Sequence, residues 1–176
     1  MKKISAIILG LTFVSQCFGQ TTITSTTPVD VTCNGNCDGA ITINASGTGT
    51  IYYKLDGGSY QLGASFSGLC AGSGLVYAHD DVDTVSQSVT ITEPTLLTGS
   101  IIAQTDVLCN GEANGSATVA AADGTPGYTY LWDDGGISTT PGVGALPAGT
   151  YTVTVTDNNL CEAAVSVTIW EPNLVT

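Results

Sequence analysis

Hydrophobic and polar residues alternate with a period of two along several short segments of the chain. The clearest is 150–157, TYTVTVTD, in which tyrosine and valine alternate with threonine. This alternation is typical of a β-strand that buries one face in a core. The segment 163–169 repeats the pattern, and 116–121 and 128–132 are shorter candidates. The pattern therefore predicts four strands in this part of the chain.

Glycine-rich turn signals separate these candidate strands. DGTPG occupies 123–127 and DGG occupies 134–136, and such clusters mark turns because glycine and proline suit backbone conformations that strands exclude. No window shows a helical period with capping residues. Short strands rich in valine and threonine, joined by glycine-rich turns, are typical of a β-sandwich. The sequence therefore predicts an all-β fold.

The chain also repeats itself. The segment 30–43 reads DVTCNGNCDGAITI and the segment 106–119 reads DVLCNGEANGSATV. A recurrence of this length indicates duplicated architecture rather than two chance turns. We therefore predict two tandem β-sandwich repeats, a degenerate one at 20–96 and a clearer one at 97–176.

Later turn signals extend the alignment of the two copies. We align Asp56-Gly57-Gly58 with Asp134-Gly135-Gly136, which leaves Asp133 as the unmatched residue. In this alignment Leu55 takes the place of Trp132 and faces inward, whereas Lys54 faces water. A lysine pointing into solvent agrees with the cost of burying an unpaired charge.

The first 19 residues are typical of a secretory signal peptide. Lys2 and Lys3 precede an apolar run, and we expect cleavage after Gly19. The run is too short to span a bilayer. A lipoprotein alternative would acylate Cys17, but Gln16 before it is larger than such processing sites usually accept. We expect export through the Sec pathway and no membrane insertion after cleavage.

Charge restricts the partners of the exported chain. Without the leader, Lys54 is the only strong base among 15 acidic residues. Such a surface cannot neutralise phosphates, so it disfavours nucleic acid and anionic lipid head groups as partners.

The cysteines predict disulfide bonds, which persist in exported proteins. In the second copy, Cys109 precedes the first confident strand and Cys161 lies between the last two, so we predict that they pair. The first copy has Cys37 and Cys70, and both are absent from the second copy. We predict that these two also pair, which leaves Cys33 as the odd thiol.

Two alternatives for the first copy stay open at this point. Cys33 could pair with Cys70 and leave Cys37 free, since spacing alone does not fix connectivity. Zinc binding by Cys33 and Cys37 is disfavoured, because no second pair of ligands follows and the compartment favours oxidation.

The motifs resemble a known family. The phrases DVTCNGNCDG, VLCNGEANGS, GTPGYTYLWDDGG and LPAGTYTVTVTDNNLCEA resemble the SprB-type repeat of large surface adhesins from gliding Bacteroidota. The resemblance covers nearly all of the exported chain. It implies immunoglobulin-like or PKD-like sandwiches in arrays, a secreted or cell-surface location, and a role in adhesion and, in some members, gliding motility. It also implies further repeats of the same parent chain. The ligand, a surface glycan or a protein, is not specified.

One feature departs from the family pattern. Nothing after Trp170 resembles the secretion-sorting domain with which such proteins often end. The segment EPNLVT at 171–176 instead matches EPTLLT at 93–98, where the second copy begins. We therefore expect that the chain is a fragment of a longer adhesin.

Catalytic and metal-binding motifs are weak. His79 is the only histidine, so a nucleophile would have one candidate base, and we predict no enzymatic activity. We predict no cofactor. Calcium bound by acidic clusters at 80–83, 133–134 and 157–159 is the alternative, although aspartate and asparagine are also common turn formers and no EF-hand spacing occurs.

Exposed aromatic residues offer a competing function. Trp170 faces away from the core and is a candidate for a ligand or inter-repeat contact. A carbohydrate-binding accessory module of a larger secreted enzyme is the alternative to an adhesion module. A sugar platform needs coplanar rings, for which the candidates are Trp170, Tyr52 and Tyr60.

Overall fold

The fold consists of β-strands. The structure is a computed structural model that describes residues 20–174, so the predicted signal peptide at 1–19 lies outside the described residues. The described residues contain no helix, and hence none that is long and apolar enough to cross a membrane. The strands are β1 (Thr22–Val29), β2 (Gly39–Ser46), β3 (Tyr52–Leu55), β4 (Ser65–Leu69), β5 (Gly72–His79), β6 (Thr84–Ile91), β7 (Thr98–Thr105), β8 (Gly115–Ala122), β9 (Thr129–Trp132), β10 (Gly142–Leu146), β11 (Gly149–Thr156) and β12 (Glu162–Ile169).

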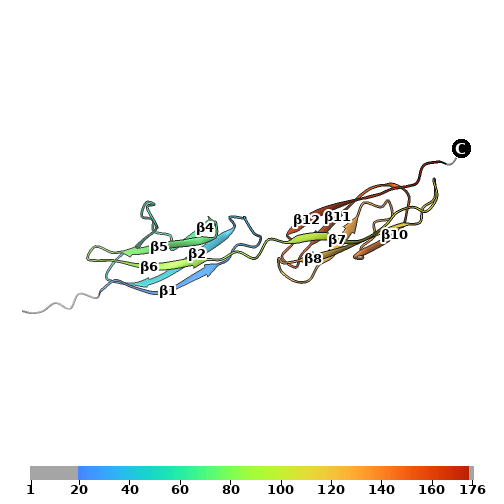
Figure 1. Ribbon diagram of the computed structural model, residues 1–176. Coiled ribbons are helices and arrows are strands. Elements are labelled where there is room, and N and C mark those ends of the chain that lie inside the picture. The colour runs from blue at the N-terminus through green and yellow to red at the C-terminus, as the bar shows by residue number, and fades with distance from the viewer. Residues whose placement is uncertain (1–19, 175–176) are drawn as a thin grey trace, which may run out of the picture.

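The strands form two sandwiches with the same topology. In the first repeat, one sheet has the order β1-β2-β4 and the other β3-β5-β6. In the second repeat, the orders β7-β8-β10 and β9-β11-β12 reproduce this arrangement strand for strand. All pairs are antiparallel. The two sandwiches lie end to end in an elongated molecule (Figure 1). The prediction of an all-β protein with two tandem immunoglobulin-like sandwiches is confirmed.

The alternating sequence pattern determines which side chains are buried. In β11, Val153 and Val155 are fully buried, whereas the threonines that alternate with them lie on the other face. Threonines of β11 pair across the strands with hydroxyl side chains of β12, as Thr150 does with Thr168 at 3.0 Å. The valines thus fill the core on one face of the sheet, and the threonines form cross-strand hydrogen bonds on the other face.

Each sandwich has its own hydrophobic core. The cluster in the second repeat surrounds Trp132, which is 1% exposed. The cluster in the first repeat is built from aliphatic residues, with Leu55 only partly buried at its edge. The fully buried members of the first cluster are Val31, Ile41, Ile43, Val76, Val89 and Ile91. The two clusters share no residue, so the two copies are packed as separate units.

The structure corrects one detail of the alignment between the copies. Asp56 exchanges hydrogen bonds with Leu75, and it is Asp133, not Asp134, that makes the same contacts with Thr152. The extra residue of the second copy therefore follows Asp133, in the turn itself.

Lys54 is also less free than expected. It is half-buried, and its Nζ lies 4.9 Å from the ring centroid of Tyr60 and 4.4 Å from that of Tyr77. The lysine faces outward, as predicted, but it is held between aromatic rings by cation–π attraction.

Candidate functional site at the junction of the repeats

The motif that recurs in the sequence forms a loop at the C-terminal end of each sandwich. We call residues 30–38 the first CNG loop and residues 106–114 the second CNG loop. In the first, the Thr92 N–H donates to Asp30 at 2.7 Å, and the Val31 N–H donates to the Thr92 carbonyl at 3.1 Å. These bonds hold the loop against the chain as it leaves β6. They also hold the pKa of Asp30 below its usual value, chiefly through the Thr92 backbone N–H.

In the middle of the first loop, the Asn-Gly of the motif forms hydrogen bonds with the Glu-Pro that follows β6. Gly35 has a φ of 79°, a conformation that favours glycine. Its N–H donates to the Glu93 carboxylate at 2.8 Å, and the Asn34 side chain donates to the Pro94 carbonyl at 3.1 Å. The first loop therefore fixes the direction in which the chain passes to the next repeat.

The second CNG loop makes the same contacts. The Gly111 N–H donates to Glu171 at 2.8 Å, and the Asn110 side chain donates to the Pro172 carbonyl at 3.1 Å. The Trp170 N–H donates to Asp106 at 3.0 Å, which is the main cause of a lowered pKa at this carboxyl. The recurring sequence phrase is thus the signature of one hydrogen-bonded loop that closes the end of each sandwich.

The last glycine of the motif is required by close packing. A Cβ on Gly39 would lie 2.9 Å from the Leu69 carbonyl oxygen and 3.0 Å from the Ile91 side chain. A Cβ on Gly115 would lie 2.5 Å from the Ile169 side chain and 2.9 Å from the Leu146 carbonyl oxygen. Only glycine lets the first residue of β2 and of β8 approach its neighbours so closely.

The opposite end of each sandwich is closed by a hairpin turn built around one aspartate. In the β11–β12 turn, residues 157–161, Asp157 accepts from the N–H groups of Asn159 and Cys161, both at 2.9 Å, and from Thr125 at 2.8 Å. Burial raises the pKa of Asp157, but the three backbone donors outweigh it and hold the pKa below its usual value. The turn is therefore rigid, and it presents Cys161 at a defined position.

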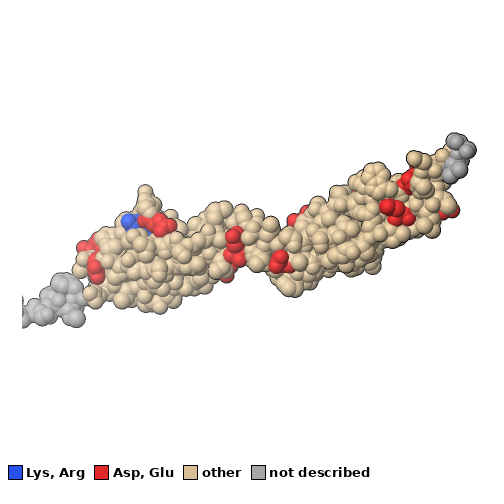
Figure 2. Space-filling model, viewed as in Figure 1, with Lys and Arg blue, Asp and Glu red and all other residues tan. Residues whose placement is uncertain are grey.

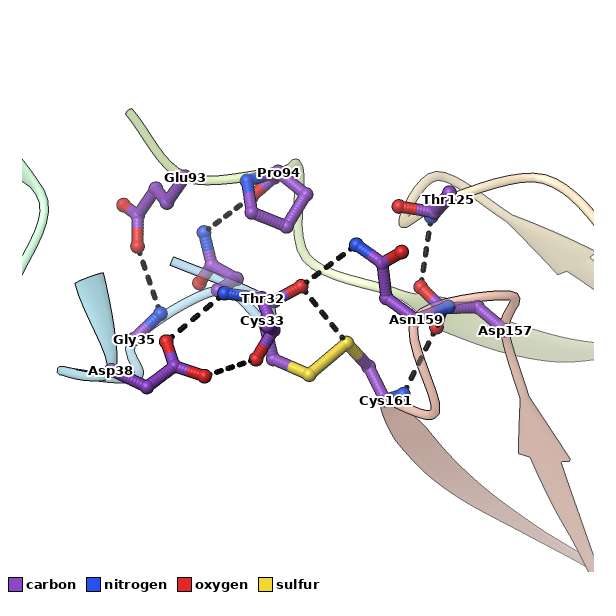
Figure 3. The surroundings of a disulfide bond; sticks show 11 residues. Thr32, Cys33, Gly35, Asp38, Glu93, Pro94, Thr125, Asp157, Asn159 and Cys161 are labelled. Carbon is purple, nitrogen blue, oxygen red and sulfur yellow. Dashed lines mark hydrogen bonds between the residues drawn. A yellow bond between two sulfur atoms is a disulfide. The ribbon is translucent and has the colours of Figure 1, made fainter. Parts of the chain in front are cut away.

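The first CNG loop and the β11–β12 turn meet at the junction of the two repeats. Cys33 of the loop forms a disulfide with Cys161 of the turn, with a Cα–Cα distance of 5.7 Å (Figure 3). Beside it, the Asn159 side chain donates to the Thr32 carbonyl at 3.0 Å. Thr32 is itself held by Asp38, which accepts from its N–H and its hydroxyl. The hydroxyl is the main cause of a lowered Asp38 pKa.

This disulfide corrects the pairing expected from the sequence. Cys161 does not pair with Cys109, and Cys33 is not the free thiol; Cys109 is exposed and unbonded. The physical reason is that Cys109 and Cys161 lie at opposite ends of the second sandwich. Because β7 carries the chain away from the junction and β12 does the same, the loop after β7 cannot reach the turn before β12.

A second disulfide stays within the first repeat. It joins Cys37 of the first CNG loop to Cys70, which lies between β4 and β5 at the same end of the sandwich. The loop that carries Cys33 is thus anchored to its own repeat on one side and to the next repeat on the other.

The loops also coincide with the regions that match a protein family. The SprB repeat family matches residues 25–59 and again residues 101–136, and each span includes one CNG loop. Two segments of the chain, one in each sandwich, are therefore similar to the SprB repeat. No curated protein sequence matches the chain.

Several solved structures are similar in part to the two tandem sandwiches. The three N-terminal domains of the highly immunogenic outer capsid protein of bacteriophage RB49 are 15% identical, with 86% of this chain and 58% of that chain covered and a TM-score of 0.49. A C-terminal fragment of intimin, solved with the intimin-binding domain of its translocated receptor, is 16% identical, with 86% and 64% covered and a TM-score of 0.42. Three immunoglobulin domains of titin are 16% identical, with 86% and 65% covered and a TM-score of 0.45. This chain spans less than two thirds of each.

The acidic clusters of the two repeats accept hydrogen bonds from the N–H groups of their own turns. Asp80 is buried and accepts from the N–H groups of Val82, Asp83 and Thr48, each at 2.9 Å. The Val82 and Asp83 donors are the main causes of its strongly lowered pKa. Asp134 likewise accepts from Ser138 and Gly136. Across residues 20–174, no three His, Cys, Asp or Glu side chains gather as a metal ion would require.

His79 has a structural environment in the first repeat. Its Nδ1 lies 2.8 Å from the Thr84 hydroxyl and 3.2 Å from the Asp83 carbonyl oxygen, and its ring packs against Tyr60 at 5.3 Å between centroids. The half-buried ring thus bridges the ends of β5 and β6. It is less exposed than a simple turn residue would be.

The aromatic candidates for ligand binding are not brought together. Trp170 is 66% exposed while Ile169 before it is buried, as the alternation predicted. Trp170 belongs to the second repeat, whereas Tyr52 and Tyr60 belong to the first. Tyr60 instead packs against the ring of His79, with an angle of 46° between the two ring planes.

Proposed function

We propose that the two SprB repeats form a stiff, non-catalytic segment of an exported cell-surface protein of the adhesin type. The observation that carries this proposal is the Cys33–Cys161 disulfide between the repeats. The role of this segment would be to hold binding regions at a distance from the cell, or to present its own surface to a glycan or protein partner.

Stiffness follows from the number of connections at the junction. Domains joined only by a linker move relative to each other by default. Here the linker at 92–97 is one connection and the disulfide is another, and Asn159 adds a hydrogen bond beside it. Two covalent connections restrict hinge motion, so the end-to-end arrangement in Figure 1 would persist under load.

The chemistry of the chain supports a location outside the cytoplasm. Disulfides persist in oxidising compartments, and the described residues hold two of them. On the face shown in Figure 2, carboxylates gather around the ends of the sandwiches and the junction, and the strand faces between them carry few charges. Export through the Sec pathway by the predicted signal peptide would complete this route.

Surface display can be tested on cells that produce the protein. Antibodies raised against the purified chain should label intact cells, and the label should disappear after brief protease treatment. Deletion of residues 20–174 from the parent protein should reduce attachment of the cells to glass or to host surfaces. Labelling that appears only after the cells are permeabilised would refute the proposal.

A role in gliding is a narrower form of the same proposal, supported by the family match alone. Cells with the deletion should then move more slowly over glass, as measured by tracking single cells. Unchanged speed together with reduced attachment would restrict the function to adhesion.

A carbohydrate-binding accessory module is the second candidate, favoured by the exposure of Trp170. A glycan array should then show saturable binding that is lost in a Trp170→Ala variant and kept in a Tyr52→Ala variant. Tyr52 is the matched control because it is a partly exposed aromatic residue of the other repeat. Absence of saturable binding would leave the adhesion segment as the better description.

A further inference from the structure

Cys109 occupies the same place in the second CNG loop that Cys33 occupies in the first. Both precede an Asn-Gly whose glycine has a φ near 80°, 79° in Gly35 and 80° in Gly111. Both loops are held to a Glu-Pro segment by the same pair of hydrogen bonds. In the first loop this cysteine is bonded to the hairpin turn of the following repeat, whereas Cys109 is exposed and unbonded.

We propose that Cys109 is the attachment point for a further immunoglobulin-like unit, which forms a disulfide with it through a cysteine in its hairpin turn. The docking face consists of Leu108, Cys109, Trp170 and Leu174. This inference rests on the proposed function and adds to it the partner that binds the C-terminal end of the two-repeat segment. The observed junction between the repeats is the template for the contact.

The surroundings of Cys109 suit burial against a partner. Leu108 is 74% exposed, Trp170 66% and Leu174 70%. Leu108 and Trp170 take the places of Thr32 and Thr92 in the first repeat, so the second CNG loop and its surroundings are more apolar than the first. Leu108 and Trp170 line one surface hollow, and exposed large apolar side chains that lie together mark interaction surfaces.

The sequence that follows the second sandwich also indicates another unit. The segment 171–176, EPNLVT, repeats 93–98, EPTLLT. In the first junction, Leu97 of this segment is buried in the core of the following repeat. The equivalent position of the second segment carries another branched apolar residue, valine. The chain therefore continues from the second CNG loop with the same signal that begins the second repeat.

A second copy of this chain cannot supply the required cysteine. Its Cys161 is already bonded to Cys33. Its other hairpin turn, between β5 and β6, has Asp83 at the equivalent position. Asp80 and Asp83 exchange the same backbone and carboxylate hydrogen bonds as Asp157 and Cys161. The partner is therefore a different repeat, and covalent extension is directional, away from the β5–β6 turn.

Bond formation needs an electron acceptor. Each thiol loses a proton, and together the two sulfurs lose two electrons to a disulfide reagent or to an oxidoreductase disulfide, which is reduced to two thiols. The thiolate of one cysteine attacks the mixed disulfide carried by the other and releases the second thiol of the reagent.

The β5–β6 turn supplies a probe for this reaction. Wild-type chain is mixed with an Asp83→Cys, Cys109→Ser variant in a buffer of reduced and oxidised glutathione. The matched control is Ser88→Cys, Cys109→Ser, because Ser88 is exposed in the middle of β6, where it pairs with Leu75 and not at the hairpin turn. Heterodimers are counted by non-reducing electrophoresis and peptide mapping. The first mixture should form them about tenfold faster, since docking raises the effective concentration of the thiols.

Each other outcome of the mixing experiment overturns the proposal. Equal rates for the probe and the control would show only a reactive surface thiol. Predominant linkage of Cys109 to Cys109 of a second copy would assign the face to self-association, and stable capture of glutathione alone would assign it to small thiols.

A measurement without variants provides an independent check. Protein isolated from the native cells is alkylated and digested without reduction. The peptide containing Cys109 should be linked to a cysteine peptide from outside residues 20–174. Recovery of Cys109 as an alkylated free thiol would overturn the proposal. If this linkage is found but antibodies fail to label intact cells, the surface role fails while the directional disulfide stands.

Discussion

The side-chain amide of Asn159 donates a hydrogen bond of 3.0 Å to the backbone carbonyl of Thr32, across the junction between the two sandwiches. The Cys161 sulfur, bonded to Cys33, lies 3.5 Å from the same oxygen. The first repeat thus contributes a loop fixed by its own hydrogen bonds, and the second contributes a turn fixed by Asp157. Because both partners are rigid before they meet, the contact orients the repeats as well as joining them.

Removal of the junction disulfide should increase the motion between the two repeats without unfolding either of them. In a Cys161→Ser variant, each core remains, because the two clusters share no residue. We expect the wild-type circular dichroism spectrum, but a shorter mean extension and a broader distance distribution by small-angle X-ray scattering. Cys109→Ser is the control and should leave the scattering curve unchanged. An unchanged curve for the Cys161 variant would show that the linker and the Asn159 bond are sufficient.

Much of the fold was predictable from the sequence, because the clearest strands have one buried and one polar face. In β11 and β12 the alternation of valine with polar residues gives the strands almost to the residue. β7 and β10 were not predicted. The half-exposed pattern of β7 and the glycines of β10 give weak alternation, and these strands are specified by pairing with β8.

The junction was less predictable, because it depends on which end of a sandwich each cysteine reaches. The pair Cys109 and Cys161 looked like a link within one repeat, since both belong to the same copy. The direction of β7 and β12 separates them, and this direction follows from the topology rather than from the spacing. Four strands lie between the two cysteines, and strictly alternating strands would return the chain to the same end; the cysteines lie at opposite ends because β9 and β10 both run away from the junction.

The last glycine of the recurring motif, Gly39 in the first copy and Gly115 in the second, should not tolerate a side chain. Gly115→Ala would place a Cβ 2.5 Å from the Ile169 side chain and 2.9 Å from the Leu146 carbonyl oxygen. Such overpacking costs about 1–3 kcal/mol, which urea denaturation would detect as a lower midpoint. Gly144→Ala is the control, because its Cβ would meet no atom within 4 Å, and it should shift stability by less than about 0.5 kcal/mol. Equal stability of both variants would contradict the close approach.

The core of the second repeat should depend on Trp132. This residue is 1% exposed, and its indole N–H donates to the Thr140 carbonyl at 3.1 Å. Trp132→Ala should lower the free energy of unfolding by about 3–5 kcal/mol, through lost burial and the cavity left behind. Leu131→Ala, a neighbouring change on the outer face where the leucine is 49% exposed, should cost much less. Thermal unfolding that stays unchanged in the Trp132 variant would refute the assignment of this core.

Acid should destabilise the hairpin turns. The pKa of Asp80 is lowered chiefly by the N–H groups of Val82 and Asp83. That of Asp157 is raised by burial, but lowered overall by the N–H groups of Thr125, Cys161 and Asn159. A carboxyl with a lower pKa in the folded state contributes stability above its unfolded pKa, and this contribution is lost as the pH falls through the folded pKa. The melting temperature should therefore decline as the pH drops below the usual carboxyl value of 3.8.

The two turn aspartates can be separated from general acid effects by substitution. An Asp80→Asn, Asp157→Asn variant should melt lower than wild type at pH 7, because the neutral amide is a weaker acceptor for the turn N–H groups. Its melting temperature should also fall less between pH 4 and pH 2, measured by circular dichroism. Asp81→Asn is the matched control, because Asp81 is an exposed residue of the β5–β6 turn that also contains Asp80. This variant should keep the wild-type pH profile. Parallel profiles for the double variant and wild type would mean that other carboxylates carry the acid sensitivity.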